Sequence, residues 1–394
     1  MLTIQLIREQ KQTVIERLKI KNFNGAKIIE EILATDDERR SLQVKTNDLQ
    51  AEMNQLSKEI GVLFKKGEKE QAGQIRSRTS SLKKDLESFE DKFRAAGERL
   101  NELLVQVPNL PHVSVPPGKS SEDNLVVREG GSLPELYDDA LPHWELGTAY
   151  GILDFDLGVK ITGAGFPVFR GKGARLQRAL ISWFLDRNTG AGYEEYLPPL
   201  LVNEDSGFGT GQLPDKEGQM YHVTEDNLYL IPTAEVPVTN IYRDTILKAE
   251  DLPLKLTAYT PCFRREAGSY GKDVRGLNRV HQFDKVEIVQ VQHPSRSYES
   301  LEEMVNHVEL LVKDLGLPYR IVQLCGGDMS FTSALTYDFE VYAAAQKKWL
   351  EVSSVSNFES YQASRLRLRF REAGEKGNRL AHTLNGSSLA LPRI

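Results

Sequence analysis

A heptad repeat in the first quarter of the chain constrains the fold more than any other feature. One array of apolar and small residues fills both core positions of the heptad, at Leu42, Leu49, Leu56 and Leu63 and at Thr46, Met53 and Ile60. After Gly67 a second array does the same, at Ile75, Leu82, Phe89, Ala96 and Leu103 and at Thr79, Leu86, Phe93 and Leu100. This spacing is typical of coiled-coil helices. Because a glycine separates the arrays, we expect two long helices that fold back on each other as an antiparallel hairpin.

The charges along this hairpin are unevenly distributed. Eight basic and three acidic residues lie between residues 58 and 84, whereas the rest of 38–104 holds six basic and nine acidic residues. The eight basic residues are Lys58, Lys65, Lys66, Lys69, Arg76, Arg78, Lys83 and Lys84. A heptad array by itself predicts dimerisation or a spacer. A basic outer end indicates instead that the hairpin holds a polyanion at a distance from the main body.

The composition is that of an ordinary globular protein. The chain has 394 residues, enough for two or three domains, with 40% hydrophobic and 27% charged residues. A formal net charge of −6 excludes a uniformly basic nucleic-acid binder but allows a local basic patch. No apolar run reaches the roughly 18 residues of a membrane helix, and the N-terminus lacks a signal-peptide pattern, so we expect a cytoplasmic protein. The two cysteines, Cys262 and Cys325, are expected to be buried thiols.

Prolines mark the end of the hairpin region and predict an extended linker, at Pro108, Pro111, Pro116 and Pro117. The "GKS" inside this segment lacks the upstream glycine of a phosphate loop and is not interpreted as one. Beyond it, short β-rich segments such as "KVEIVQVQ" mix with helical ones such as "GARLQRALISWFLDRN", without regular alternation. We therefore predict an α+β fold with a mainly antiparallel sheet. The predicted divisions are an N-terminal domain (1–107), a linker (108–129) and a second domain (130–394).

The stretch "FRREAGSYGKDVRGLNRVHQFDKVE" (263–287) concentrates charge between two alternating segments. We expect a long hairpin around a loop from Gly268 to Asn278. One face of it would collect Arg264 and Glu266 from the first strand and Arg279, His281, Phe283, Lys285 and Glu287 from the second. Guanidinium groups match phosphate oxygens and an aromatic ring can stack on a base. Cross-strand ion pairs on a solvated hairpin explain the pattern equally well.

An ordered set of motifs over essentially the whole chain resembles the bacterial-type seryl-tRNA synthetases, which are class II synthetases. "GYEEYLPPLLVNED" is similar to class II motif 1, with its proline at Pro198 or Pro199, and "FRREAGS" with "RGLNRVHQFDKVE" is similar to motif 2. Further matches are "PHWELG", "GTGQLP", "IPTAEVP", "CGGDMSFTSALTYDFEV", "LEVSSVSNFESYQASRLRLRFR" and "HTLNGSSLA". The resemblance implies an antiparallel coiled-coil hairpin followed by a class II catalytic domain whose sheet is flanked by helices.

The resemblance also implies a set of ATP contacts. Arg264 would hold the α-phosphate as the carboxylate of serine attacks it. Glu266 would meet the adenine amino group, and Phe283 would stack on the adenine ring. Arg279 and Arg393 would bind the departing pyrophosphate. The full set implied for ATP is Arg264, Arg265, Glu266, Arg279, Val280, Phe283, Glu351, Val352, Ser353, Ser354 and Arg393.

For the amino acid, the family pattern implies that Thr233 and Glu235 meet the ammonium of serine, and that Glu287 and Ser387 lie near its hydroxyl. A site that requires a hydroxyl partner rejects alanine, whereas threonine must be excluded by shape. The implied serine-binding set is Thr233, Ala234, Glu235, Arg264, Glu287, Asn385 and Ser387. Taken singly, these residues could equally cap turns or pair with structural groups.

The same resemblance implies the partners. Glu351 and Ser354 would hold Mg²⁺, because a hard cation prefers oxygen ligands. The hairpin would grip the long variable arm of tRNA(Ser), and also of tRNA(Sec) in a host that has it, through the eight basic residues of its outer end. Motif 1 implies a homodimer. The expected reaction makes seryl-adenylate from serine and ATP and then esterifies the 3′ end of the tRNA.

Two other functions are weighed against this one. A relative that aminoacylates a carrier protein would lack the long hairpin, and a non-catalytic scaffold would not need intact "TAE", "FRRE", "KVE" and "EVSS" elements. Motif 3 departs from the family pattern, with Ser388 and Pro392 at two usual glycines and no helix after Arg393. We therefore expect a chain truncated at motif 3, with Arg393 poorly held near a fraying end and Pro392 at the first turn of a helix.

Overall fold

The computed structural model describes residues 1–215, 217–267 and 275–394. The chain forms two compact units. The smaller unit comprises Leu2–Lys19 and Phe23–Pro108, and the larger comprises Met1, Ile20–Asn22 and Asn109–Ile394.

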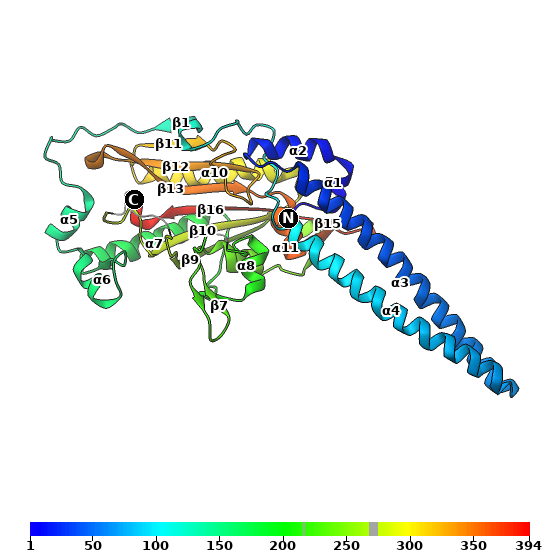
Figure 1. Ribbon diagram of the computed structural model, residues 1–394. Helices are drawn as coiled ribbons and strands as arrows, with labels where there is room; N and C mark the ends of the chain where they lie inside the picture. Colours follow the sequence, from blue (N-terminus) through cyan, green and yellow to red (C-terminus); the bar gives the residue numbers. More distant parts are fainter. Residues whose placement is uncertain (216, 268–274) are drawn as a thin grey trace. The chain divides into compact units, whose positions relative to one another are not determined.

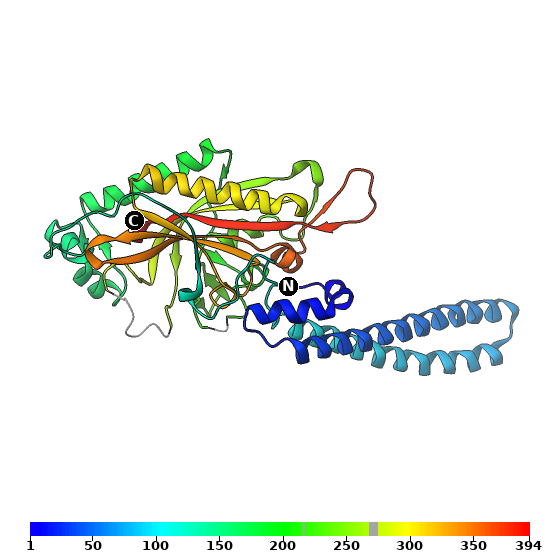
Figure 2. The same cartoon turned by 90° about the horizontal axis from the view of Figure 1, so that it is seen from above.

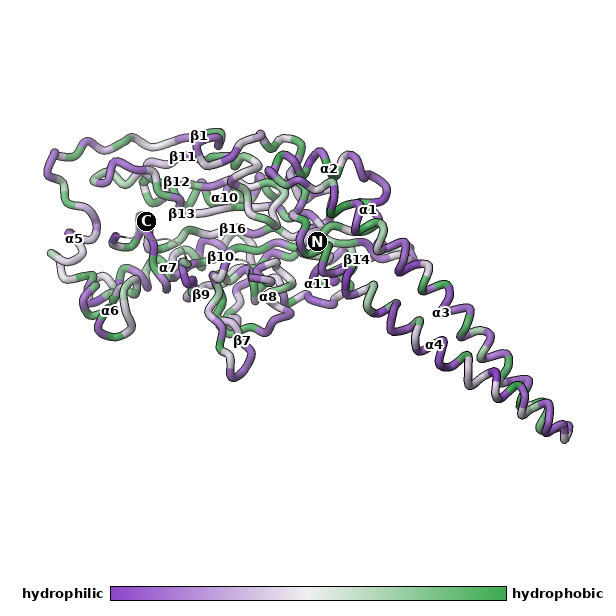
Figure 3. The backbone as a smooth tube through the Cα atoms, viewed as in Figure 1, coloured by the Kyte–Doolittle hydropathy of each residue, from purple (hydrophilic) through white to green (hydrophobic). Residues whose placement is uncertain are grey.

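The smaller unit contains the predicted hairpin (Figure 1). Two short helices, α1 (Ile4–Glu9) and α2 (Lys11–Ile20), precede the long α3 (Ala26–Lys66) and α4 (Lys69–Leu104). Gly67 ends α3 with a left-handed φ of 84°, and its N–H bonds back to the last turn of that helix. Every predicted heptad position of both helices is buried or half-buried, so the seam is confirmed. Figure 3 shows the result as a mostly hydrophilic tube interrupted by apolar steps.

An eight-stranded sheet forms the centre of the larger unit, in the order β1-β11-β12-β13-β16-β10-β9-β4. All its neighbouring strands are antiparallel except β4 and β9, which confirms the predicted mainly antiparallel sheet. Its strands are β1 (Leu125–Gly130), β4 (Glu194–Glu195), β9 (Leu254–Phe263), β10 (Gln282–Gln292), β11 (Tyr319–Gln323), β12 (Leu335–Ala343), β13 (Lys348–Asn357) and β16 (His382–Ala390).

Two amphipathic helices, α7 (Lys172–Gly190) and α10 (Ser297–Asp314), cover one face of this sheet (Figure 2). Val286 and Ile288 of β10 point into the core beneath them, together with Val305 and Val308 of α10. Because side chains alternate along a strand, the odd-numbered residues of β10 point to the opposite face. That face carries Lys285 and Glu287.

Shorter elements complete the larger unit. Its helices are α5 (His143–Ala149), α6 (Phe155–Ile161), α8 (Glu204–Thr210), α9 (Glu235–Asn240) and α11 (Ser360–Leu366). Its short strands are β2 (Leu153–Asp154), β3 (Val168–Phe169), β5 (Leu201–Val202), β6 (His222–Val223), β7 (Leu228–Leu230), β8 (Ile246–Lys248), β14 (Arg369–Arg371) and β15 (Arg379–Leu380). Its 3₁₀ turns are η1 (Ser121–Asp123), η2 (Ala249–Asp251), η3 (Pro294–Arg296), η4 (Ala344–Gln346) and η5 (Leu391–Arg393).

The segment predicted as a linker is partly ordered into the larger unit. Residues 125–130 form edge strand β1, which pairs with β11. The side chain of Asn109 is buried and donates to the carbonyl oxygens of Thr332 and Phe358. Residues 108–129 therefore contain no α-helix, but the 3₁₀ turn η1 and the start of β1 form within them. In the parts of the chain that the structure describes, no helix has the length and apolar character to cross a membrane.

Candidate active site

A buried polar cluster on β10 and the start of α9 lies where the sequence predicts the serine-binding residues. Lys285 and Glu287 form an ion pair with side-chain exposures of 8% and 2%. The Lys285 Nζ also donates to the Thr233 Oγ1 at 2.7 Å. The Thr233 hydroxyl in turn donates to the Glu287 Oε2 at 3.5 Å. A buried ion pair is stable only when such hydrogen bonds satisfy both ions.

Glu235 lies close to this cluster, at the start of α9. Its Oε1 accepts a 2.6 Å hydrogen bond from the Gln362 Nε2 of α11. Burial and, after it, the negative charge of Glu287 raise the pKa of Glu235 to about 7, whereas Gln362, Lys285 and Asn385 oppose the shift. A carboxyl group with a pKa near 7 binds a cation most strongly when it is ionised. Ala234, the residue before Glu235, is fully buried and packs in the core.

The remaining predicted serine contacts come from β16. Ser387 lies directly opposite Glu287 across the β10–β16 pair, and Asn385 lies opposite Val289 two residues away. Both are buried. The Asn385 side chain faces Glu235, whose pKa it lowers, and its buried Nδ2 makes no hydrogen bond of good geometry to the described residues. Thus residues predicted from three separate motifs do come together on one face of the sheet.

The ATP-associated residues of motif 2 lie at the ends of β9 and β10. The Arg264 Nε donates to the Pro232 carbonyl oxygen, and the guanidinium lies over the Phe283 ring, 5.2 Å from its centroid. Arg279 donates to the Glu266 Oε2 at 2.7 Å. Predicted ATP-binding residues therefore contact one another in two pairs, Arg264 with Phe283 and Arg279 with Glu266. Arg265 donates its backbone N–H to the Gln219 carbonyl, and Val280 is buried.

The strands of this hairpin are shorter than predicted. We expected Arg264, Glu266, Arg279 and His281 within strands, but β9 ends at Phe263 and β10 begins at Gln282. Glu266 has a positive φ of 49°, which is incompatible with an extended strand, and the bond from Arg265 to Gln219 turns the backbone away. Part of the predicted loop from Gly268 to Asn278, residues 268–274, lies outside the described residues.

Glu351 and Ser354, three residues apart on β13, occupy the same face of the sheet. In a regular strand such residues point to opposite faces. A register shift in the β12–β13 pair places both side chains on one face. Glu351 lies opposite Glu340 and Ser354 opposite Asp338, and these two β12 residues are two positions apart. Between them, Val352 packs into the helix-covered core, and the Ser353 hydroxyl donates to the Ser387 carbonyl. Of the four "EVSS" side chains, Glu351 and Ser354 are therefore the pair available to a ligand on this face.

Arg393 is better held than the sequence predicts. Its Nε donates to the Asn278 carbonyl oxygen at 3.2 Å, and its Nη1 donates to the Glu351 carbonyl oxygen at 2.6 Å. Pro392 lies in the 3₁₀ turn η5, which directs Arg393 toward β13. The expectation of a poorly held Arg393 is wrong, because backbone acceptors from two other elements bind it.

Sequence reasoning missed several residues of this cluster. It placed Lys285 on the correct face but gave it no role, and it did not identify Gln362 or Asp338. The Asp338 Oδ1 is buried without a hydrogen-bond partner among the described residues. Burial and the nearby charge of Glu351 raise the pKa of Asp338, whereas Ser354 lowers it. Strand alternation could have revealed Lys285, but nothing in the sequence places α11 beside α9.

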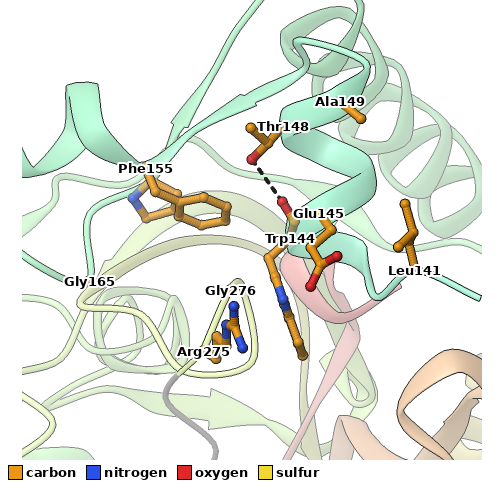
Figure 4. Close-up of a pocket in the computed structure, with 10 residues that line it drawn as sticks. Leu141, Trp144, Glu145, Thr148, Ala149, Phe155, Gly165, Arg275 and Gly276 are labelled. Carbon is orange, nitrogen blue, oxygen red and sulfur yellow. Dashed lines mark hydrogen bonds between the residues drawn. The ribbon is translucent and has the colours of Figure 1, made fainter. Parts of the chain in front are cut away.

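A separate pocket of about 730 Å³ lies beside α5 (Figure 4). Figure 4 shows Trp144 next to Arg275, whose guanidinium is 5.0 Å from the ring centroid, with Phe155 across the pocket. The Thr148 hydroxyl donates to the Trp144 carbonyl oxygen. None of the predicted serine or ATP residues lines this pocket. Its lining instead includes Trp144 and Glu145 of "PHWELG" and Arg275 and Gly276 of motif 2.

The eight predicted tRNA-binding residues all lie exposed on the outer part of α3 and α4. Arg78 pairs with Glu52, and Lys83 lies 4.0 Å from Glu87. Among the described residues, no ion pair forms to the other six. Long basic side chains in this state are available to a polyanion.

Comparisons with known proteins agree with the motifs. The family described as "Seryl-tRNA synthetase N-terminal domain" matches residues 1–111, and "tRNA synthetase class II core domain (G, H, P, S and T)" matches residues 221–394. The serine–tRNA ligase of Salinibacter ruber is 47% identical over 394 residues, covering 100% of this chain and 92% of that protein. That of Chlorobium luteolum is 48% identical over 397 residues, with the same coverage.

Solved structures show the same similarity. The seryl-tRNA synthetase of Pyrococcus horikoshii, complexed with ATP, superposes with a TM-score of 0.91 at 34% identity, covering 100% of this chain and 92% of that one. The cytoplasmic serine–tRNA ligase of Naegleria fowleri, in complex with AMP, has a TM-score of 0.86 at 25% identity, covering 100% of this chain and 91% of that one.

Proposed function

This chain belongs to the seryl-tRNA synthetase family, and on that premise we propose which of its residues carry out each step. Its reaction is ATP-dependent ligation: serine is activated as seryl-adenylate and then transferred to the 3′ end of tRNA(Ser). The observation that most supports the proposed residue roles is the buried group of Thr233, Glu235, Lys285 and Glu287 on one face of the sheet.

Serine binds to this buried group. The ionised carboxylate of Glu235 receives the ammonium of the substrate, because it is the carboxylate that lacks a lysine partner. Glu287 accepts a hydrogen bond from the serine hydroxyl. Ser387 and Asn385 line the site on the β16 side. Alanine leaves Glu287 without its donor, at a cost of about 1–3 kcal/mol.

ATP binds at the ends of β9 and β10. Adenine stacks on Phe283, whose face is covered by the Arg264 guanidinium. Stacking therefore moves Arg264 off the ring and toward the α-phosphate and the serine carboxylate, where it offsets the charge of the transition state. The Glu266–Arg279 pair opens in the same way, leaving Glu266 for the adenine amino group and Arg279 for the phosphates. Arg265, Val280 and Arg393 complete this site.

The oxygen donors on β13 fit Mg²⁺. Glu351 and Ser354 share a face, and Asp338, which lies opposite Ser354, has a buried Oδ1 without a hydrogen-bond partner among the described residues. Within residues 1–215, 217–267 and 275–394 no group of three or more His, Cys, Asp and Glu side chains could hold a metal. Mg²⁺ in nucleotide sites takes one or two protein carboxylates and completes its shell with phosphate oxygens and water. Glu351 and Ser354 would hold the ion, with Val352 and Ser353 shaping the strand between them, and the bound ion would neutralise phosphate charge.

Transfer requires the tRNA to be gripped by the exposed basic end of α3 and α4. These side chains contact backbone phosphates, which carry no base identity. The proposal therefore includes tRNA(Ser) and, in a host that makes it, tRNA(Sec).

We also propose a cytoplasmic homodimer. Large apolar side chains are exposed on α6 and α7, on or next to α5, and in motif 1, at Leu146, Tyr150, Val159, Ile161, Leu176 and Leu197. A second copy of the chain would cover such side chains. A cytoplasmic location follows from the substrates, since ATP and tRNA are used there.

Serine-dependent exchange of pyrophosphate into ATP tests the proposal directly. We expect exchange with serine, a much weaker signal with alanine or threonine, and a requirement for Mg²⁺. Exchange that does not depend on serine would refute the proposed pocket.

A further inference from the structure

We propose that Lys285 is a positioning residue that sets serine specificity by holding Glu287 as a fixed, ionised acceptor. This inference rests on the serine pocket proposed above. It adds a cation to a site whose implied residues include two carboxylates, Glu235 and Glu287, but no lysine. Lys285 contacts both Glu287 and Thr233 and is itself buried.

The hydrogen bonds of the Thr233 side chain connect Lys285 to Glu287. A threonine hydroxyl has one donor and two acceptor positions. Its acceptor positions receive the Lys285 Nζ at 2.7 Å and the backbone N–H of Glu235 at 3.2 Å. Its proton is directed to the Glu287 Oε2. The Thr233 hydroxyl is therefore fully engaged in tying Lys285 to Glu287, and the predicted contact of Thr233 with the ammonium of serine would come from its backbone.

The Glu287 carboxylate is consequently engaged on one oxygen only. Its Oε2 contacts both Lys285 and Thr233. No described residue donates a hydrogen bond to its Oε1. This oxygen is not among the fully enclosed side-chain atoms that lack a partner, so it is left accessible to a hydrogen-bond donor on the substrate. The substrate hydroxyl can supply that donor, whereas the methyl group of alanine cannot.

Charge balance leads to the same conclusion. With Glu235 and Glu287 ionised, Lys285 balances Glu287, which leaves Glu235 for the ammonium of serine. Arg264 is left for the serine carboxylate, so the charges of the site and of the substrate balance. Without Lys285, two buried carboxylates would face each other, and one would take up a proton. Loss of Lys285 would favour protonation of Glu235, because Lys285 opposes the raised pKa of that carboxyl. Glu287 would also lose the partner that fixes its Oε2, so discrimination between serine and alanine would weaken.

The test compares Lys285→Met, Glu287→Gln and the double variant in pyrophosphate exchange. For Lys285→Met we expect the KM for serine to rise at least about 30-fold, as when one partner of a buried pair is removed. The KM for ATP should stay within about 3-fold, and the serine-to-alanine ratio of kcat/KM should fall at least about 10-fold. Because Lys285 acts through Glu287, the double variant should lose much less than the product of the two single losses.

Lys255→Met is the matched control. Lys255 lies on the adjacent strand β9, opposite Gln290 and on the helix-covered face, where it lies 3.5 Å from Glu303. Its loss should leave the KM for serine unchanged. If Lys285→Met does not fold, Lys285→Gln takes its place, since it keeps a donor for Thr233 but removes the charge.

The possible outcomes separate this inference from the proposed function. Absence of serine-dependent exchange in the unsubstituted protein would refute the function itself. Normal exchange there, combined with an unchanged KM for serine in Lys285→Met, would refute only the role of Lys285. Multiplicative losses in the double variant, or equal increases in the KM for ATP and serine, would assign Lys285 a merely structural role.

Discussion

In the outer part of the α3–α4 hairpin (residues 58–84) the charged side chains lie in solvent around a narrow apolar seam, whereas in the larger unit the charges of the serine pocket lie beneath the surface. The basic end of the hairpin spreads eight cations over two helices, and six of them have no ion-pair partner among the described residues. The pocket holds one lysine between two carboxylates. Exposed charges are weak individually and are screened by salt. Buried charges depend on each partner.

The largest expected effect comes from removing one buried charge. Glu287→Ala should lower kcat/KM for serine by roughly 100-fold or more, because the substrate hydroxyl and Lys285 both lose their acceptor. Lys66→Gln at the end of α3 removes one exposed charge and should leave pyrophosphate exchange unchanged. Steady-state exchange kinetics with serine measure both variants. A Glu287→Ala enzyme with an unaltered kcat/KM would show that the pocket is misassigned.

A smaller effect is expected from pH. Burial raises the pKa of Glu235 to about 7. Below that pH the Glu235 carboxyl is mostly protonated and must lose its proton to bind the ammonium of serine. The affinity for serine should therefore fall as pH decreases through 7, by up to about 10-fold per unit. Measuring the KM for serine between pH 6 and 7.5 tests this. Glu235→Gln should bind serine more weakly but without this dependence, and a flat profile in the unsubstituted protein would contradict the role of Glu235.

The smallest effect is expected from the seam. Leu56 is only half-buried, so Leu56→Ala should cost about 1 kcal/mol or less of unfolding free energy. Val286 is fully buried under α10, so Val286→Ala should lower the unfolding free energy by more than Leu56→Ala does. Thermal unfolding compares the two variants. Exchange activity should survive Leu56→Ala, and its loss would show that the hairpin contributes to adenylation.

How much could be predicted from sequence differs between the two regions. The hairpin follows from local spacing, since a heptad repeat and Gly67 specify both helices and their turn. Alternation along β10 likewise predicted that Lys285 and Glu287 share a face. Long-range pairing was beyond such reasoning: the bulge that aligns Glu351 with Ser354 depends on strand β12, and Gln362 reaches Glu235 from a helix more than a hundred residues away. Backbone acceptors for Arg393 were equally invisible in the sequence.

The most direct test of this division of labour measures adenylation and transfer in one variant. It replaces by Gln five exposed basic residues of the hairpin: Lys65, Lys66, Lys69, Arg76 and Arg78. We expect the rate of pyrophosphate exchange to stay within about 2-fold of that of the unsubstituted protein. The KM for tRNA should be higher, and it should depend less steeply on salt. Each lost phosphate contact should lower the slope of log K against log salt by about 0.9. Equal loss of exchange and transfer, or an unchanged salt slope accompanied by loss of oligomer mass, would contradict the account.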